Sequence, residues 1–340
     1  MQQAIARLLD RKDLSREEAR GVMNTIMSGE ATPAQIGAFL VALRLKGETA
    51  DEITGCAEAM RAHVLPVHPT RVDLVDVVGT GGDGANTFNI STTSAIVAAA
   101  AGAAVAKHGN RAASSASGSA DVLEALGFRL DLSPERIARS IDELGFGFMF
   151  AQAHHPAMKH AAPVRRELGT RTVFNVLGPL TNPAGARAGI FGVATADLMR
   201  TYAEALVKLG TSRAYVVHGF GGIDELSPAG PNEVCEVVDG DVHERVVDPL
   251  KLGLEPCAPE DLAGGSPSDN AATARAILGG SETGGKLQAV ILNAGGAIAA
   301  AGHAADLREG IELAREAVAS GAAAERLDRL IAFSQEAVSR

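Results

Sequence analysis

The first 65 residues carry apolar positions at the spacing of amphipathic helices. Behind Pro33, the residues Ile36, Phe39, Leu40 and Leu43 recur at i, i+3, i+4 and i+7 and form one apolar stripe. Three capping-box sequences mark helix starts, namely Ser15 with Glu18, Thr32 with Gln35, and Thr49 with Glu52. We therefore predict a small helical domain over residues 1–65. Because three such helices cannot bury all of their stripes alone, we expect this unit to pack on the rest of the chain.

The pattern changes after a proline-containing, hinge-like connector at residues 64–70. Residues 72–78 alternate β-branched residues with Asp, which predicts a strand, and residues 91–103 form an Ala-rich helix that is apolar on nearly every side. We predict further strands at 104–106, 146–150 and 214–217, helices at 134–144, 196–209 and from 287 onward, and a loose polar stretch at 263–270. This alternation predicts an α/β domain over residues 70–340, with a central sheet flanked by helices.

Composition and charge narrow the class of protein. Hydrophobic residues make up 46% and charged residues 21%, as in ordinary globular proteins, and no apolar run approaches the roughly 18 residues of a membrane span. Arg7 and Asp10 interrupt any signal-peptide core. The three cysteines, Cys56, Cys235 and Cys257, lie far apart, which favours a reducing compartment. The net charge of −10 disfavours nucleic-acid binding. We expect a cytoplasmic protein without a membrane anchor.

A glycine-rich loop at residues 79–84, Gly-Thr-Gly-Gly-Asp-Gly, follows the first predicted strand. Its spacing matches the dinucleotide fingerprint G-x-G-x-x-G, but the surrounding sequence does not. That fingerprint needs a helix that opens inside the glycine run and an acidic residue about 20 positions later. Here residues 85–90 intervene before the helix, and the next strand ends at Lys107. We therefore exclude a Rossmann dinucleotide site.

Two polar loops nevertheless predict one anion site. Glycines let backbone N–H groups approach an anion closely, and Asn89, Ser91 and Thr92 are placed to cap a helix whose N-terminus attracts phosphate. The second loop, residues 107–115, follows the second strand and holds two cations, two hydroxyls and an amide. Loops that follow parallel strands gather at one sheet edge, so we expect these two loops to form a single site.

Two further motifs suggest the other ligands. Asp224 and Glu225 are adjacent on a glycine-rich turn and suit Mg²⁺, which takes few protein ligands. Taken alone, the pair favours an ordinary acidic turn over a metal site. Arg165 and Arg166 offer a guanidinium fork for a carboxylate, although either is also compatible with a surface charge.

Six sequence blocks together resemble the signature set of the anthranilate phosphoribosyltransferases. They occur in the family's order, the resemblance covers nearly the whole chain, and the blocks are residues 79–83, 89–92, 107–111, 117–124, 174–183 and 224–227. The resemblance implies a homodimer with a small helical domain and a larger α/β domain of the type shared with pyrimidine nucleoside phosphorylases. It also implies that the small domain includes a later excursion around residues 165–183.

The resemblance implies a reaction as well. The family transfers the phosphoribosyl group of phosphoribosyl pyrophosphate (PRPP) to the amine of anthranilate in tryptophan biosynthesis, with two Mg²⁺ ions per subunit. Because the amine already has a lone pair, a strong general base is not required, and no catalytic residue is assigned beyond electrostatic support from Lys107, with His108 as a secondary candidate. Stabilisation of the departing pyrophosphate is expected to dominate.

Site residues are carried over by motif. PRPP is expected to contact Gly79, Gly82, Asp83, Thr87, Asn89, Ile90, Ser91, Thr92, Lys107, His108, Gly109, Asn110, Arg111, Ala112, Ala113, Ser114, Ser115 and Ser119. Mg²⁺ is expected at Ser91, Asp224 and Glu225, and anthranilate at Gly79, Asn110 and Arg165, with His108 and His155 lining its entrance. Ala112 and Ala113 depart from the family, which commonly has Ser followed by an aliphatic residue there.

Two alternative functions remain open from the sequence. A nucleoside phosphorylase of the same fold would cleave nucleosides with phosphate and would not need Asp224 and Glu225. A non-enzymatic relative would bind nucleic acid, which the charge of −10 disfavours.

Overall fold

The computed structural model of the chain describes residues 1–112 and 116–336. Its N-terminal helices are α1 (Gln2–Leu9), α2 (Arg16–Met27), α3 (Pro33–Lys46) and α4 (Ala50–Ala62). All three predicted capping boxes are formed, at the starts of α2, α3 and α4. Helix α1 was not predicted, because its N-cap residue Met1 makes no side-chain capping bond. The small unit therefore has four helices rather than three.

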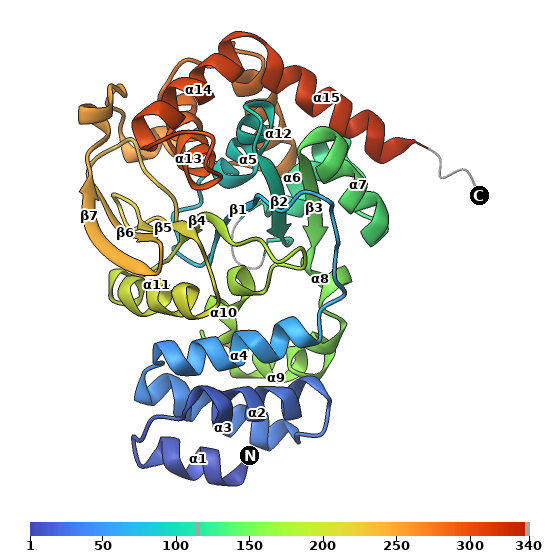
Figure 1. The fold of residues 1–340 in the computed structure, drawn as a ribbon, viewed down its shortest axis with the longest axis vertical. Coiled ribbons are helices and arrows are strands. Elements are labelled where there is room, and N and C mark those ends of the chain that lie inside the picture. The colour runs from blue at the N-terminus through green and yellow to red at the C-terminus, as the bar shows by residue number, and fades with distance from the viewer. Residues whose placement is uncertain (113–115, 337–340) are drawn as a thin grey trace.

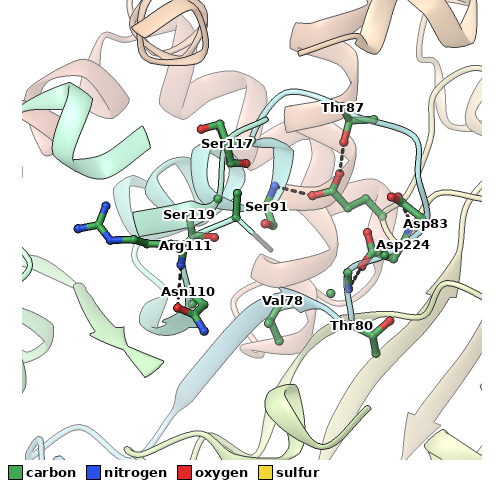
Figure 2. Close-up of a pocket in the computed structure, with 18 of the residues that line it drawn as sticks. Val78, Thr80, Asp83, Thr87, Ser91, Asn110, Arg111, Ser117, Ser119 and Asp224 are labelled. Carbon is green, nitrogen blue, oxygen red and sulfur yellow. Dashed lines mark hydrogen bonds between the residues drawn. The ribbon is translucent and has the colours of Figure 1, made fainter. Parts of the chain in front are cut away.

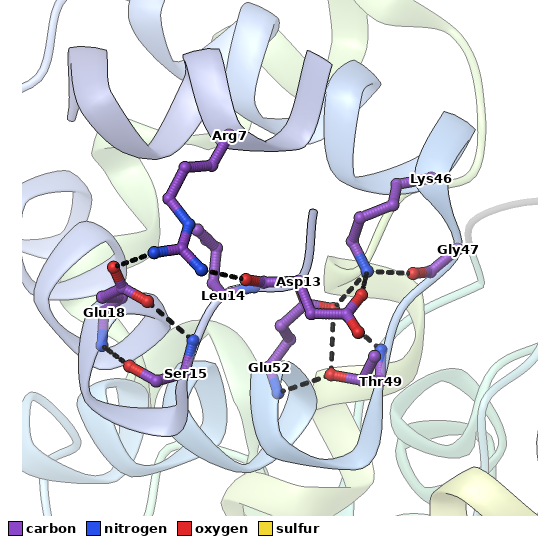
Figure 3. Close-up of polar contacts among 9 residues, drawn as sticks. All are labelled: Arg7, Asp13, Leu14, Ser15, Glu18, Lys46, Gly47, Thr49 and Glu52. Carbon is purple, nitrogen blue, oxygen red and sulfur yellow. Dashed lines mark hydrogen bonds and ion pairs between the residues drawn. The ribbon is translucent and has the colours of Figure 1, made fainter. Parts of the chain in front are cut away.

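A buried carboxylate ties these helices together (Figure 3). The side chain of Glu52 is fully buried and accepts hydrogen bonds from the N–H of Leu14 at 2.9 Å and of Thr49 at 2.8 Å. The Lys46 ammonium, itself almost fully buried, lies 2.9 Å from the same carboxylate. One side chain thus joins the loop before α2 to the end of α3 and the start of α4.

We expect Glu52→Ala to lower the free energy of unfolding by about 2–4 kcal/mol, since it removes one of the two carboxylates that pair with the Lys46 ammonium and leaves the N–H groups of Leu14 and Thr49 without their acceptor. Urea denaturation at constant pH measures this loss. The matched control is Glu17→Ala, whose carboxylate is largely exposed. A loss at Glu52 no larger than at Glu17 would show that the buried carboxylate does not hold the helices together.

The second part of the chain contains a seven-stranded sheet in the order β3-β2-β1-β4-β5-β6-β7. Its strands are β1 (Leu74–Gly79), β2 (Ala104–Gly109), β3 (Phe146–Phe150), β4 (Ala188–Gly192), β5 (Arg213–His218), β6 (Asn232–Val238) and β7 (Asp241–Val247). The first five strands are parallel, whereas β6 and β7 form an antiparallel hairpin at the edge. All four predicted strands are confirmed. Strands β4, β6 and β7 were missed.

Helices cover both faces of the sheet. The helices that follow the N-terminal four are α5 (Ile90–Ala100), α6 (Ser119–Leu126), α7 (Pro134–Leu144), α8 (Ala151–His154), α9 (Ala162–Leu168), α10 (Phe174–Leu177), α11 (Met199–Lys208), α12 (Pro267–Leu278), α13 (Gly285–Ala300), α14 (Leu307–Ala319) and α15 (Ala322–Gln335). Of these, α9 and α10 pack on α3 and α4 instead of covering the sheet. One core joins α5 and α12–α15 to one face of the sheet, and a second core runs from the N-terminal helices through α11 to the other face. Figure 1 shows this stacking, with α11 and α4 between the sheet and the first three helices.

Several predictions differ from the structure in detail. Strand β2 continues to Gly109, so Lys107 and His108 belong to the strand rather than to the loop after it, because β3 pairs with β2 as far as Gly109. Helix α5 ends at Ala100 rather than at residue 103. The stretch 263–270 is not loose, since Ser266 forms a capping box with Asp269 and starts α12.

The strand order reverses between β1 and β4. From β1 the chain adds β2 and β3 on one side, and then β4 and β5 on the other. In an open α/β sheet, ligands bind at the carboxyl ends of the strands where the order reverses. Gly79 ends β1, Gly192 ends β4, and the two residues are paired. The predicted glycine loop therefore lies at the switch point.

No helix in the described ranges combines the length and apolar character needed to cross a membrane.

Candidate active site

A cavity of about 400 Å³ lies at this switch point (Figure 2). The glycine loop, the start of α5, the end of β2 with its following loop, the start of α6 and the turn after β5 surround it. Of the predicted site residues, the cavity brings together Gly79, Gly82, Asp83, Thr87, Asn89, Ser91, Lys107, His108, Gly109, Asn110, Arg111, Ala112, Ser119, Asp224 and Glu225. The two polar loops and the acidic turn thus face one space.

Several predicted residues do not line the cavity. Ile90 and Thr92 are buried within α5. Arg165 lies on α9 with its guanidinium 5.2 Å from the centre of the Phe174 ring, and burial lowers its pKa. Ala113, Ser114 and Ser115 lie outside the described residues. Asn175, which lies in the motif block 174–183 but was not among the expected contact residues, does line the cavity.

The N-terminus of α5 is capped differently from the prediction. Asn89 is the N-cap residue but makes no side-chain capping bond; its amide nitrogen donates to the Ser117 carbonyl at 3.1 Å and its amide oxygen accepts from Asn270 at 2.9 Å. The Ser91 N–H instead donates to the Glu225 carboxylate at 2.9 Å. An acidic side chain from the turn after β5 therefore already occupies part of the positive helix end.

Close backbone approach places Asp224 beside the glycine loop. A Cβ atom on Gly79 would overlap the Asp224 carboxylate, and one on Gly192 would overlap the Asp224 carbonyl, so only glycine fits at these paired strand ends. The Asp224 carboxylate accepts from the Gly81 N–H at 2.6 Å, and the Asp224 N–H donates to Asp83 at 3.2 Å. The acidic turn and the loop are therefore one interlocked unit.

These carboxylates repel one another electrostatically. Burial, together with the nearby Asp83, raises the pKa of Asp224 to about 6. Burial and then Asp224 raise the pKa of Glu225 well above its usual value. Buried acidic groups in mutual repulsion are stabilised by a cation between them.

The donor set fits Mg²⁺ that is shared with a substrate. Among the described residues no three His, Cys, Asp or Glu side chains are arranged to hold a metal by themselves. Mg²⁺ commonly takes only one or two carboxylates and completes its shell with water and substrate phosphates. Asp224, Glu225 and the hydroxyl of Ser91 meet that requirement at the cavity wall.

Lys107 is the buried cation of the site. Its side chain is 1% exposed, and the ammonium donates to the Val77 carbonyl at 2.6 Å and to the Ser91 hydroxyl at 3.4 Å. Burial lowers the pKa of Lys107, whereas Asp76 and Glu225 act to raise it. The Nζ atom of Lys107 therefore lies beneath the start of α5, next to the carboxylates and the cavity.

Arg111, by contrast, is engaged with neighbouring residues. Its guanidinium forms ion pairs with Asp121 and Glu124 of α6 and lies 5.6 Å from the centre of the Phe150 ring. Two carboxylates thus compensate its charge at the rim of the cavity. Contact with a phosphate would require Arg111 to share or exchange these partners.

His108, which lines the cavity, and His155, which does not, form a neutral pair. Their Nε2 atoms are 3.1 Å apart, and the Nδ1 of His108 lies 3.1 Å from the Gly178 carbonyl. Since a carbonyl only accepts, His108 carries its proton on Nδ1, and His155 must donate from Nε2. Burial lowers the pKa of His108 to about 3 and that of His155 to about 4, so both stay neutral.

Comparison with known proteins agrees with this geometry. A glycosyl transferase family helical bundle domain matches residues 2–64, and a glycosyl transferase family α/β domain matches residues 71–324. The anthranilate phosphoribosyltransferase of Anaeromyxobacter sp. (strain Fw109-5) is 52% identical over 335 residues, which cover 98% of this chain and 99% of the relative.

Solved structures agree with the sequence relatives. The crystal structure of anthranilate phosphoribosyltransferase from Thermus thermophilus superposes with a TM-score of 0.93 at 51% identity and covers 98% of this chain and 99% of its own. The Saccharomyces cerevisiae enzyme in complex with PRPP and Mg gives a TM-score of 0.89 at 29% identity, with 98% and 97% covered. By sequence and by fold over nearly its whole length, the chain belongs to the anthranilate phosphoribosyltransferase family.

Proposed function

We propose that this chain transfers the phosphoribosyl group of PRPP to the amine of anthranilate and releases pyrophosphate. The observation that carries the proposal is the convergence of a glycine loop, a buried lysine and an acidic turn on one cavity at the switch point of the sheet. Family membership supports the same reaction. A nucleoside phosphorylase is not favoured, because phosphorolysis gives no role to the buried pair Asp224 and Glu225.

The pyrophosphate end of PRPP is proposed to lie against the glycine loop and the start of α5. Backbone N–H groups of the loop and the ammonium of Lys107 are the donors that meet it, alongside the other predicted PRPP residues that line the cavity. Two Mg²⁺ ions, held through Ser91, Asp224 and Glu225, would neutralise the negative charge that develops on the leaving group. A chain with a net charge of −10 thereby binds an anionic substrate.

Anthranilate is proposed to lie toward Gly79, Asn110 and Arg165. Its amine attacks C1 of the ribose from the face opposite the pyrophosphate, which gives inversion. The neutral pair His108 and His155 suits an entrance for an aromatic ring and does not act as a strong base. Holding both reactants in this geometry orients them for reaction, which lowers the activation free energy by roughly 7–11 kcal/mol in favourable cases.

Anthranilate fluorescence tests the proposal directly. The fluorescence should fall when PRPP and Mg²⁺ are added with the protein, and it should stay constant when either is omitted. Constant fluorescence in the complete mixture would overturn the proposed function. Release of a free base from nucleosides, dependent on phosphate, would support the phosphorylase instead.

Arg165→Ala should raise the KM for anthranilate about 10–100-fold and change the KM for PRPP far less, because the guanidinium fork is proposed to hold the anthranilate carboxylate. Steady-state kinetics with each substrate varied in turn measures the two constants. The control is Arg166→Ala, since that neighbouring arginine is exposed. Equal changes in both constants would mean that the carboxylate is held elsewhere.

We propose two domains, residues 1–65 with the excursion 165–183, and residues 70–340. Contacts of α9 with α3 support the excursion.

We also propose that the chain forms a homodimer and that it works in the cytoplasm. The free cysteines favour the reducing cytoplasm. Leu9 and Leu45 on the adjacent helices α1 and α3 are 69% and 68% exposed and suit a self-contact. Sedimentation of the whole chain tests the dimer.

A further inference from the structure

An arginine that lies outside the six motif blocks forms hydrogen bonds with the glycine loop. Arg171 lies in the segment between α9 and α10, some 90 positions away in the sequence, and its Nη1 donates to the carbonyls of both Gly81 and Gly82 at 2.9 Å. Arg171 itself does not line the cavity, whereas both glycines do. Its guanidinium therefore contacts the loop and not the space in which a ligand would lie.

The glycine at position 82 leaves room for this guanidinium. Gly82 has φ +76, in the left-handed region that favours glycine, and a Cβ atom at this position would overlap the Nη1 of Arg171. A glycine at position 82 thus serves the backbone turn and the arginine contact together.

These two hydrogen bonds fix the direction of two amides. In a trans peptide the C=O and the following N–H point in opposite directions. With the carbonyls of Gly81 and Gly82 held toward Arg171, the N–H groups of Gly82 and Asp83 point away from it. Within residues 1–112 and 116–336, neither N–H donates to a protein acceptor. Two adjacent free amides on one side of a loop make an anion-binding concavity.

Both ends of the contact are anchored. The Gly81 N–H donates to the Asp224 carboxylate at 2.6 Å. The loop is therefore held on both sides, because Arg171 donates to the carbonyls of Gly81 and Gly82. On the other end, the Thr172 N–H donates to the side chain of Asn175 at 2.9 Å, and Thr172 is buried. Arg171 therefore projects from a fixed turn rather than from a free loop.

We propose that Arg171 is a positioning residue for PRPP, which acts by holding the Gly82 and Asp83 amides toward the pyrophosphate. The inference rests on the proposed function and adds a residue that touches no substrate. It also links the excursion around residues 165–183, from which Arg165 is proposed to reach anthranilate, to the loop that binds PRPP.

The experiment compares Arg171→Ala, Arg171→Lys and Arg166→Ala by kinetics and by calorimetric titration with PRPP and Mg²⁺. We expect Arg171→Ala to weaken PRPP binding and raise its KM by at least about tenfold, because two charge-assisted hydrogen bonds are lost. The KM for anthranilate and kcat should change less than about threefold, because the reacting atoms keep their donors. Arg171→Lys, which can still donate to both carbonyls, should recover most of the loss, and Arg166→Ala should resemble the unmodified chain.

The inference is overturned if PRPP binds Arg171→Ala as tightly as it binds the unmodified chain, or if kcat falls with PRPP binding unchanged. If Arg171→Ala fails to fold, Arg171→Gln, whose shorter and uncharged amide removes the charge from both hydrogen bonds, gives the same comparison. Titration with PRPP does not depend on transfer to anthranilate. An unmodified chain that binds PRPP but leaves anthranilate fluorescence constant would therefore count against the proposed function and not against the role of Arg171.

Discussion

Replacing Asp224 with Asn and Glu225 with Gln together should abolish turnover, with a loss of kcat of at least about a thousandfold. The amides keep the size of both side chains and can still accept hydrogen bonds from Gly81 and Ser91. What they lose is the negative charge that is proposed to attract Mg²⁺. Without the cation, the cavity keeps its amide donors and Lys107 but cannot neutralise a departing pyrophosphate.

Steady-state rates at increasing Mg²⁺ measure this effect. Chelation should stop the unmodified enzyme, and added Mg²⁺ should restore it, whereas the double variant should stay inactive at every concentration. The control pair is Glu233→Gln with Asp241→Asn, two exposed carboxylates on β6 and β7, which should leave the rate unchanged. Near-normal activity of the Asp224 and Glu225 variant in saturating Mg²⁺ would refute the metal assignment.

Stability separates this loss of charge from a loss of structure. Burial and Asp83 raise the folded-state pKa of Asp224 from an ordinary value of 3.8 to about 6. An acid whose pKa is raised by folding destabilises the fold as pH rises from its unfolded to its folded pKa, here between 3.8 and about 6. In metal-free solution at pH 7 the double variant should therefore unfold at the same temperature as the unmodified chain or at a higher one.

Local signals in the sequence predicted much of the fold. The capping boxes at Ser15, Thr32 and Thr49 are complete within four residues, so they needed no tertiary information. Strand β4 was missed because its sequence Ala-Gly-Ile-Phe-Gly gains strand character only between β1 and β5. The β6–β7 hairpin does have a local signal, because Asp239-Gly240 is a dipeptide typical of tight hairpin turns, and both residues have positive φ in the structure.

In the candidate site, too, the sequence predicted local features but not the contacts between separate elements. Motif blocks located most of the residues that line the cavity, because these follow strand ends and parallel strands share an edge. They did not predict that Glu225 would accept from Ser91 or that Arg111 would pair with Asp121, because those contacts depend on how separate elements pack. Arg171 was missed for a related reason: its partners are backbone carbonyls, which leave no pattern of residue types in the sequence.

The last of the large effects concerns Lys107. We expect Lys107→Met to lower kcat/KM for PRPP by about 10²–10³-fold, because it removes a preorganised positive charge next to the proposed leaving group. Methionine has a similar length and keeps the buried stem packed, so the change isolates the charge. The control is Lys286→Met, a partly exposed lysine whose ammonium lies 5.7 Å from the centre of the Phe88 ring and outside the cavity.

The same variant should also change how stability depends on pH. Burial raises the pKa of Asp76 to about 6, and Lys107 is the largest factor that opposes this rise. Without Lys107 the folded-state pKa of Asp76 should rise further, and the fold should then lose more stability at pH 8 than at pH 5. Thermal unfolding at the two pH values measures the difference. A pH-independent loss, or an unchanged kcat/KM, would mean that Lys107 contributes packing rather than charge beneath the start of α5.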